Sequence, residues 1–385
     1  MKRSIISPRE DWQKRCERID FGWHTQGGVK YWNEGVCYRF TAAQIDQIEA
    51  AAEEAHAMCM ALVADIITRG RYEGFRFPKQ VLDMIVPTIE ASWKRSDPSL
   101  YGRFDFGVKF VNGALGLKLF ENNADTPTSL YEASVVQHLW MKDLGFADQF
   151  NSIEEKMDAF FKAHPATHMH FVALRDAGKE DWGTVGYIAE RAEECGKSVN
   201  ILSVEDLGWD GKQAFTDLSN TPIGTAFKLY PGEWMFGDVF GQNMALTTTR
   251  WIEPPWKTLL SSKAILPLLW EKYPNHPLLL PSFFEADGDK MMEGDWIKKP
   301  LFSREGSNVF HVRDGVEELA AGSHLSSFYE HYGYIGQQRF DSSKFDGMMP
   351  VLGAWIVNGE AAGMGIREDA GVTGNGSLFT PHYFD

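Results

Sequence analysis

The stretch RFDFGVKFVNGALGLKLFENNADTPTS, residues 103–129, carries the signals from which the fold is inferred. Residues 102–109 and 115–120 are predicted to be two strands, and the Asn112-Gly113 pair between them is typical of a type I′ hairpin turn. The second strand runs directly into a dense polar segment, residues 121–129. A polar segment at a strand end is a common place for binding or catalytic side chains.

A long helix is predicted ahead of this hairpin. Thr41 and Gln44 form a capping box, in which each side chain can satisfy a backbone N–H of the first helical turn. Apolar residues then recur at three- and four-residue steps from Ile45 to Ile66, and Gly70 ends the pattern.

Strands and helices alternate after the hairpin. Residues 168–174, 182–195 and 198–204 are predicted to form a βαβ unit, and residues 227–230 a further strand. A last hairpin is predicted from residues 351–357 and 360–366, which flank Asn358-Gly359. The pattern as a whole indicates an α+β protein.

Composition narrows the class of protein. The 385 residues hold 38 Lys and Arg against 53 Asp and Glu, a net charge of −15, and 44% are hydrophobic. This indicates a chain folded throughout, as two or three domains or one elaborate one. The negative charge argues against nucleic-acid binding, which needs a basic surface, and makes a cationic substrate such as a polyamine plausible.

The sequence indicates a soluble cytoplasmic protein. The four cysteines lie far apart and include no CxxC pair, so neither a disulfide scaffold nor a zinc framework is expected. The first residues lack the apolar stretch of a signal peptide, and no run approaches the roughly 18 apolar residues of a membrane span.

A first polar cluster is predicted at the end of the hairpin. Residues two apart on a strand share a face, so Arg103 and Asp105 point the same way, as do Glu121 and Asn123. Carboxylates and an amide carbonyl are the oxygen ligands that Mg²⁺ takes. An ordinary surface ion-pair patch would contain the same residues.

Two further clusters are basic. Lys263 and Lys299, the latter beside the loop of residues 303–306, could hold phosphate oxygens, although a charged loop alone would look alike. Arg367, at the end of the last hairpin, could stabilise charge on a phosphoryl or acyl group or form a simple ion pair. No GxSxG motif or cysteine–histidine pair suggests a covalent nucleophile. Together the clusters suggest nucleotide-dependent group transfer.

Four motifs carry a resemblance to a known family. NNADTPTSLYE at 122–132, SKAILPLLW at 262–270, KPLFSREG at 299–306 and GIRED at 365–369 resemble the glutathionylspermidine synthetase family, above all its stand-alone acid–amine ligases. The resemblance implies a permuted ATP-grasp fold with a Rossmann-like pre-ATP-grasp βαβ domain and a helical N-terminal part. The implied division is 1–165, 166–250 and 251–385, with the site shared between the first and last parts.

The resemblance also implies roles for individual residues. Arg103 and Asp105 look like the pair for ATP phosphate and Mg²⁺, and Glu121 and Asn123 like the remaining metal ligands. The other implied roles are ATP binding by Lys263, Lys299 and Gln338, catalysis by Arg103 and Arg367, and substrate binding at Thr126 and Thr128, where the synthetases have serines.

The implied reaction joins an acid and an amine at the expense of ATP, with Mg²⁺. The acid would be glutathione or another peptide-like carboxylate, and the amine could be a polyamine. The amidase domain of the bifunctional members is expected to be absent. Where the glutathione-using synthetases carry an acidic pair, the alignment by motif places Trp182-Gly183, with Glu180 and Asp181 just upstream. A phosphotransferase acting on a small acid, or a nucleotide-binding protein without turnover, are the alternatives.

Overall fold

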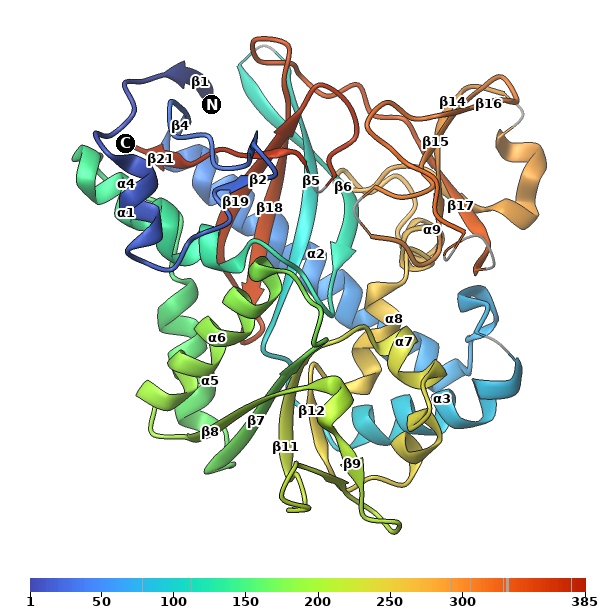
Figure 1. Cartoon of the computed structure of the whole chain (residues 1–385). Coiled ribbons are helices and arrows are strands. Elements are labelled where there is room, and N and C mark those ends of the chain that lie inside the picture. The colour runs from blue at the N-terminus through green and yellow to red at the C-terminus, as the bar shows by residue number, and fades with distance from the viewer. Residues whose placement is uncertain are drawn as a thin grey trace.

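The two ends of the chain lie together in the fold (Figure 1). The computed structural model describes residues 1–77, 79–111, 113–291, 293–304, 306–327, 329, 332–374 and 376–385. A three-stranded sheet joins β1 (Lys2–Ile5), β4 (Val36–Phe40) and β21 (His382–Phe384). Between β1 and β4 lie α1 (Trp12–Glu17) and a small hairpin of β2 (Thr25–Gln26) and β3 (Val29–Lys30). The first forty residues therefore pack beside the last strands of the chain.

A five-stranded antiparallel sheet forms the middle of the molecule, in the order β20-β19-β18-β5-β6. The strands are β5 (Tyr101–Val111), β6 (Ala114–Asn123), β18 (Met349–Val357), β19 (Glu360–Asp369) and β20 (Leu378–Phe379). Both predicted hairpins are confirmed as strand pairs, and Asn358 and Gly359 have the positive φ angles that a type I′ turn requires. Asn112, in the other predicted turn, lies outside the described residues.

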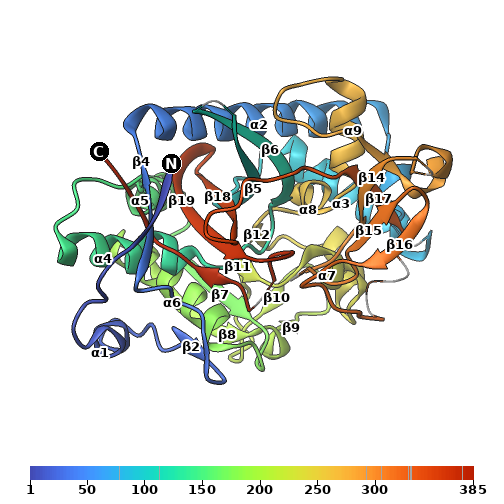
Figure 2. The same ribbon diagram turned by 90° about the horizontal axis from the view of Figure 1, so that it is seen from above.

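The predicted long helix is confirmed as α2 (Ala42–Arg69), which covers one face of this sheet (Figure 2). The Thr41 hydroxyl accepts from the Gln44 N–H, and the Gln44 side chain accepts from the Thr41 N–H, so the predicted capping box is present. Gly70 ends the helix in the left-handed conformation. The buried side of α2 packs against the sheet, and α3 (Lys79–Lys94) follows it.

The predicted βαβ unit is confirmed, and its largest boundary shift is at the start of the helix. A parallel sheet has the order β12-β11-β7-β8, made of β7 (His168–Ala173), β8 (Ser198–Ser203), β11 (Thr225–Leu229) and β12 (Arg250–Ile252). The helix, α6 (Lys179–Glu194), begins three residues before its predicted start at 182. Gly178 ends the loop in an extended conformation, and Glu180 and Asp181 in the first turn suit the positive end of the helix dipole.

A second five-stranded sheet lies beside the central one, in the order β13-β17-β14-β15-β16 (Figure 1). Its strands are β13 (Ser282–Phe284), β14 (Asp295–Pro300), β15 (Phe310–Arg313), β16 (Val316–Leu319) and β17 (Tyr334–Gln338). Gln338, which the resemblance implies in ATP binding, is the last residue of β17 and pairs there with Trp296 of β14.

The remaining elements connect these sheets. They are α4 (Gln137–Leu144), α5 (Ile153–Ala163), α7 (Gly232–Gly237), α8 (Thr258–Ser261), α9 (Ile265–Lys272), β9 (Gly208–Trp209) and β10 (Phe215–Thr216). Within the described ranges, no helix combines the length and apolar character needed to cross a membrane. The division at residues 165 and 250 stays a prediction.

Candidate functional site

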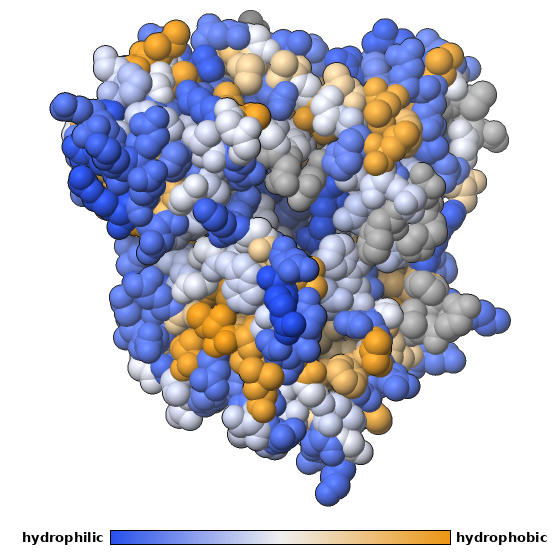
Figure 3. Space-filling model, viewed as in Figure 1, coloured by the Kyte–Doolittle hydropathy of each residue, from blue (hydrophilic) through white to orange (hydrophobic). Residues whose placement is uncertain are grey.

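Two cavities adjoin at the polar ends of β5 and β6, and the face of the molecule in Figure 3 is hollowed near its middle. We call them the arginine cavity, about 570 Å³, and the lysine cavity, about 390 Å³. Asp105, Glu121 and Asn123 line both. The other predicted site residues line one of the two: Arg103, Thr126, Thr128 and Arg367 the arginine cavity, and Lys263, Lys299 and Gln338 the lysine cavity.

The register of β5 and β6 brings the first predicted cluster together. Arg103 lies opposite Asn123, and Asp105 opposite Glu121. The Arg103 guanidinium donates to both Asp105 carboxylate oxygens, Nε at 2.6 Å and Nη2 at 2.9 Å. Burial raises the pKa of Asp105, and the charge of Arg103 opposes that rise. Gly353 on β18 makes room for this pair, since a Cβ there would lie 2.7 Å from Cδ of Arg103.

The same cluster has the donor atoms for a magnesium ion. Asn123 Nδ2 lies 3.0 Å from Asp105 Oδ2 and 3.2 Å from Glu121 Oε1, so the three groups converge on one point. Rotation of the Asn123 side-chain amide by 180° would present its oxygen to the same point. Among the described residues no three His, Cys, Asp or Glu could hold a metal ion by themselves. A Mg²⁺ ion here would draw its further ligands from phosphate and water, as is usual for this ion.

Two buried lysines face Glu121 in the lysine cavity. Lys263 Nζ lies 3.2 Å from Glu121 Oε2 and donates to the Ser303 carbonyl at 3.1 Å. Lys299 Nζ donates to Gln337 Oε1 at 2.8 Å and to the Phe120 carbonyl at 3.0 Å. Burial alone would raise the pKa of Glu121, but the two lysines outweigh it and lower that pKa to about 2.

Burial lowers the pKa of Lys299 to about 8, even though Glu121 opposes that change. Lys299 therefore carries its charge at neutral pH and loses it as the pH rises through about 8. Away from the lysines, the cavity has apolar walls that include Leu280, Ile297, Val309 and Phe340.

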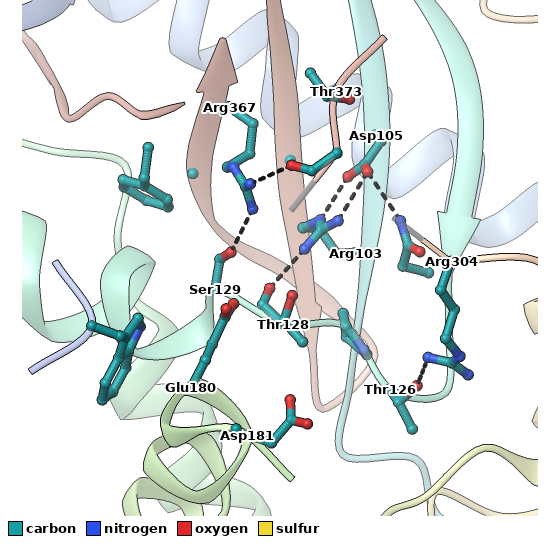
Figure 4. A pocket seen from close by; sticks show the side chains of 18 of the residues that line it. Arg103, Asp105, Thr126, Thr128, Ser129, Glu180, Asp181, Arg304, Arg367 and Thr373 are labelled. Atoms are coloured by element: carbon teal, nitrogen blue, oxygen red, sulfur yellow. Dashed lines mark hydrogen bonds and ion pairs between the residues drawn. The ribbon is translucent and has the colours of Figure 1, made fainter. Parts of the chain in front are cut away.

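Arg103 and Arg367 line the arginine cavity and are labelled in Figure 4. Arg367 donates to Ser129 Oγ at 3.3 Å and to the carbonyls of Gly374 at 2.7 Å and Ser377 at 3.0 Å. Arg103 Nη1 donates to the backbone carbonyl of Thr128 at 2.7 Å. The polar end of the hairpin and the end of β19 therefore present two guanidinium groups to one space.

Arg304 is a third arginine of this cavity that the prediction of site residues did not include. Its Nη1 donates to the Thr126 hydroxyl, its Nη2 lies 3.4 Å from Glu233, and its guanidinium lies over the Trp234 ring, 5.5 Å from the centroid. These contacts tie the segment after β14 to the polar segment after β6. Glu305, in the predicted phosphate loop, lies outside the described residues.

Glu180 and Asp181 form an acidic pair in this cavity, whereas Trp182-Gly183, which the alignment by motif placed at the position of the family's acidic pair, does not line it. Glu180 and Asp181 line the cavity from the first turn of α6, as Figure 4 shows. Gly183 lies one turn further on and packs against Trp23, where a Cβ would approach the indole ring to 2.3 Å. The acidic side chains on this wall of the cavity therefore come from Glu180 and Asp181, two residues upstream of the pair chosen by motif.

Part of the wall of the arginine cavity comes from the first forty residues, which we call the N-terminal segment. Gly22, Trp23, Thr25 and Gln26 line it. No periodic pattern or motif in the sequence marks these residues, because their position depends on pairing with the end of the chain. Arg304, by contrast, lies within the motif KPLFSREG and could have been included on that ground.

Comparison with known proteins places the chain in a family. The family model "Glutathionylspermidine synthase preATP-grasp" matches residues 3–385. A Haemophilus influenzae protein named "Putative acid--amine ligase" is 45% identical over 402 residues, with 100% of both chains covered.

Two longer relatives match more distantly. Trypanothione synthetase of Crithidia fasciculata is 27% identical over 86% of this chain and 54% of its own length. The bifunctional glutathionylspermidine synthetase/amidase of Escherichia coli is 24% identical over 86% of this chain and 56% of its own. The chain thus spans about half the length of these two relatives.

A solved structure shares the fold at low sequence identity. It is a glutathione synthetase-like effector from Globodera pallida, with a TM-score of 0.57 and 12% identity, covering 99% of this chain and 100% of the other. With the family model matched over residues 3–385, the chain belongs to the glutathionylspermidine synthase preATP-grasp family.

Proposed function

We propose that the protein is an ATP-dependent carboxylate–amine ligase of permuted ATP-grasp fold, which releases ADP and forms an amide bond. One observation carries the proposal: the polar end of the β5–β6 hairpin separates a cavity with two buried lysines from a cavity with arginines and an acidic pair. The phosphates of ATP and the carboxylate of the acid would therefore lie next to each other at Asp105, Glu121 and Asn123.

ATP would bind in the lysine cavity. Lys263 and Lys299 would hold its phosphates, and Gln338 with the apolar walls would hold the base. Asp105, Glu121 and Asn123 would hold Mg²⁺, which when bound neutralises phosphate charge. In the chain these ligands precede the lysines, the reverse of the usual ATP-grasp order, which supports the permuted form.

The reaction would proceed in two transfers. A carboxylate oxygen of the acid attacks the γ-phosphorus, the bond to ADP breaks, and an acyl phosphate forms. The amine then attacks the acyl carbon, phosphate leaves, and the nitrogen loses a proton. Arg103 and Arg367 face the space where negative charge develops in both steps, and Arg304 ties down the segment that would exclude water.

The arginine cavity would take both organic substrates. Its guanidinium groups suit a carboxylate, and Thr126 and Thr128 add hydroxyl groups for a peptide-like acid such as glutathione. Glu180 and Asp181 suit an ammonium group, of a polyamine or of the peptide itself. Binding of a separate amine substrate at this pair would favour a ligase over a phosphotransferase, because phosphorylating an acid needs no amine.

The test measures ADP release from Mg-ATP with glutathione and spermidine, with mass spectrometry of the mixture. An adduct lighter than the two reactants by one water would support the ligase. A phosphorylated acid formed without the amine would indicate a phosphotransferase, and ATP bound without ADP release a nucleotide-binding protein. ATP turnover that neither compound stimulates would point to another acid and amine.

Asp105→Asn is the matching variant, because it keeps the size of the side chain and removes its charge. It should abolish Mg²⁺-dependent turnover. Asp143→Asn is the control, since Asp143 also pairs with an arginine, Arg9 at 2.8 Å, but lines neither cavity. Full turnover by Asp105→Asn would refute the assigned site.

A further inference from the structure

The N-terminal segment reaches Arg367 by extending the central sheet. Phe379 of β20 lies opposite Arg367 of β19. On its other side, the Phe379 N–H donates to the Tyr31 carbonyl at 2.8 Å, and the Asn33 N–H donates to the Phe379 carbonyl at 2.8 Å. Residues 31–33 thus lie beside β20, with Trp32 paired to Phe379, and Tyr31 is the residue just before this pair.

Tyr31 contacts Arg367 directly through its ring and is connected to it indirectly through Ser129. The guanidinium carbon of Arg367 lies over the Tyr31 ring, 5.0 Å from its centroid. The Tyr31 hydroxyl lies 3.0 Å from Ser129 Oγ, the same oxygen that accepts from Arg367 Nη1 at 3.3 Å. Tyr31 is only 3% exposed, so these contacts are made away from bulk water.

The hydrogen bonds of this group run in one direction. Arg367 can only donate, so Ser129 Oγ accepts from it. The Tyr31 hydroxyl donates to Glu132 Oε1 at 2.9 Å, which leaves its lone pairs for the Ser129 hydroxyl. A chain of hydrogen bonds therefore runs from Arg367 through Ser129 and Tyr31 to Glu132, and the hydrogen bonds in such a chain polarise one another.

Glu132 ends this chain of hydrogen bonds, and its surroundings hold its side chain in place. Its side chain is fully buried, and the same Oε1 accepts from Trp23 Nε1 at 2.7 Å. It opens the π-helix of Glu132–Val136, a rare element that often occurs at functional sites. Burial first and then the nearby Glu180 raise the pKa of Glu132 to about 7.

We propose that Tyr31 is a positioning residue for Arg367, held in place by Glu132, so that the N-terminal segment sets the orientation of the guanidinium in the arginine cavity. The proposal rests on the proposed function for the role of Arg367, and on the contacts above for the positioning. Tyr31→Phe keeps the ring and breaks the chain of hydrogen bonds, whereas Tyr31→Leu removes both contacts.

The kinetic test is a double-mutant cycle of Tyr31→Phe and Arg367→Ala, read as ADP formation from Mg-ATP with glutathione and spermidine. Tyr31→Phe should lower kcat about fivefold to tenfold, the effect of one buried hydrogen bond, and leave the KM for ATP unchanged. In the Arg367→Ala background it should cause no further loss. Equal losses in both backgrounds would overturn the proposal.

Tyr38→Phe is the matched control. Tyr38 is also a buried tyrosine of the N-terminal segment, and it donates at 2.8 Å to Glu368, which neighbours Arg367 on the opposite face of β19. This variant should lower stability without changing kcat. A drop in kcat as large as that of Tyr31→Phe would assign the effect to the segment's packing and overturn the specific role of Tyr31.

A second measurement does not depend on turnover. In protein labelled with ¹⁵N-arginine, the Nε–H resonance of Arg367 is identified by its loss in Arg367→Lys. Tyr31→Leu removes the ring beside the guanidinium and should shift this resonance, whereas Tyr38→Phe should not. An unchanged resonance in Tyr31→Leu would overturn the positioning. If Arg367→Ala keeps its kcat while the resonance shifts, the proposed function of Arg367 fails and the positioning stands.

Discussion

The affinity for ATP should fall as the pH rises through 8, because Lys299 loses its proton there. Burial lowers the pKa of this lysine to about 8, and only the ammonium form attracts phosphate. At that pKa about nine-tenths of the protein carries the charged lysine at pH 7, but only about one-tenth at pH 9. If binding requires the charged form, the Kd for Mg-ATP should rise about tenfold over this interval.

The sign follows from the phosphate charge. Phosphate oxygens stabilise the ammonium, so ATP raises the pKa of Lys299 and binding takes up a proton above pH 8. Isothermal titration calorimetry of Mg-ATP from pH 7 to 9, without the acid or the amine, measures both the Kd and the proton uptake when repeated in buffers of different ionisation enthalpy.

Two variants test the assignment to Lys299. Lys299→Arg carries a guanidinium that stays protonated over this interval, so its Kd should be nearly independent of pH. Lys263→Arg, the neighbouring lysine, should keep the wild-type rise because Lys299 is intact. A wild-type Kd that is flat to pH 9, or a rise that survives in Lys299→Arg, would refute the reasoning.

Three further predictions concern single side chains. Glu121→Gln should lower the free energy of unfolding at pH 7, measured in urea, by about 1–3 kcal/mol. The lowered pKa of Glu121 corresponds to about 3 kcal/mol, and solvent screening reduces this value because the side chain is 29% exposed. Because the folded-state pKa lies below the usual value, the difference from wild type should be complete above about pH 4.5 and vanish towards pH 2, and a pH-independent difference would contradict the assignment. Arg367→Ala should lower kcat about 100-fold with an unchanged Kd for ATP, and a purely weakened affinity would exclude a role in the transition state. Gly183→Ala should destabilise the protein by about 1–3 kcal/mol through the clash with Trp23, whereas Gly186→Ala on the same helix, where a Cβ meets nothing within 4 Å, should be neutral or stabilising; equal effects would refute this packing.

The elements that the sequence predicts well are those set by neighbours in the chain. Helix α2 has its caps and its apolar period within thirty residues, and the turn at Asn358-Gly359 fixes the last hairpin. The same local logic brings Arg103, Asp105, Glu121 and Asn123 together, because two strands joined by a short turn have only a few possible registers.

The arrangement of the site around that hairpin depends on contacts between distant segments. Trp355 of β18 pairs with Arg103 of β5, and Gly353 leaves space for the arginine side chain, but no local pattern links residues 250 positions apart in this way. The start of α6 differs from the prediction for a more local reason. Gly178 is a weak helix-start signal, so the sequence pattern predicts a start at 182 and leaves the first turn of α6, with Glu180 and Asp181, outside the helix.

The N-terminal segment shows why such residues escape a motif-based prediction. It attaches to both faces of β19. On one face the buried Glu368 accepts hydrogen bonds from Arg3 at 2.9 Å, Asn33 at 2.8 Å and Tyr38 at 2.8 Å. On the other face Tyr31 lies against Arg367. Because alternate residues of a strand point to opposite faces, one set of contacts anchors the segment while the other reaches the cavity. Only the second set touches the proposed chemistry, and neither can be found without the pairing of the two chain ends.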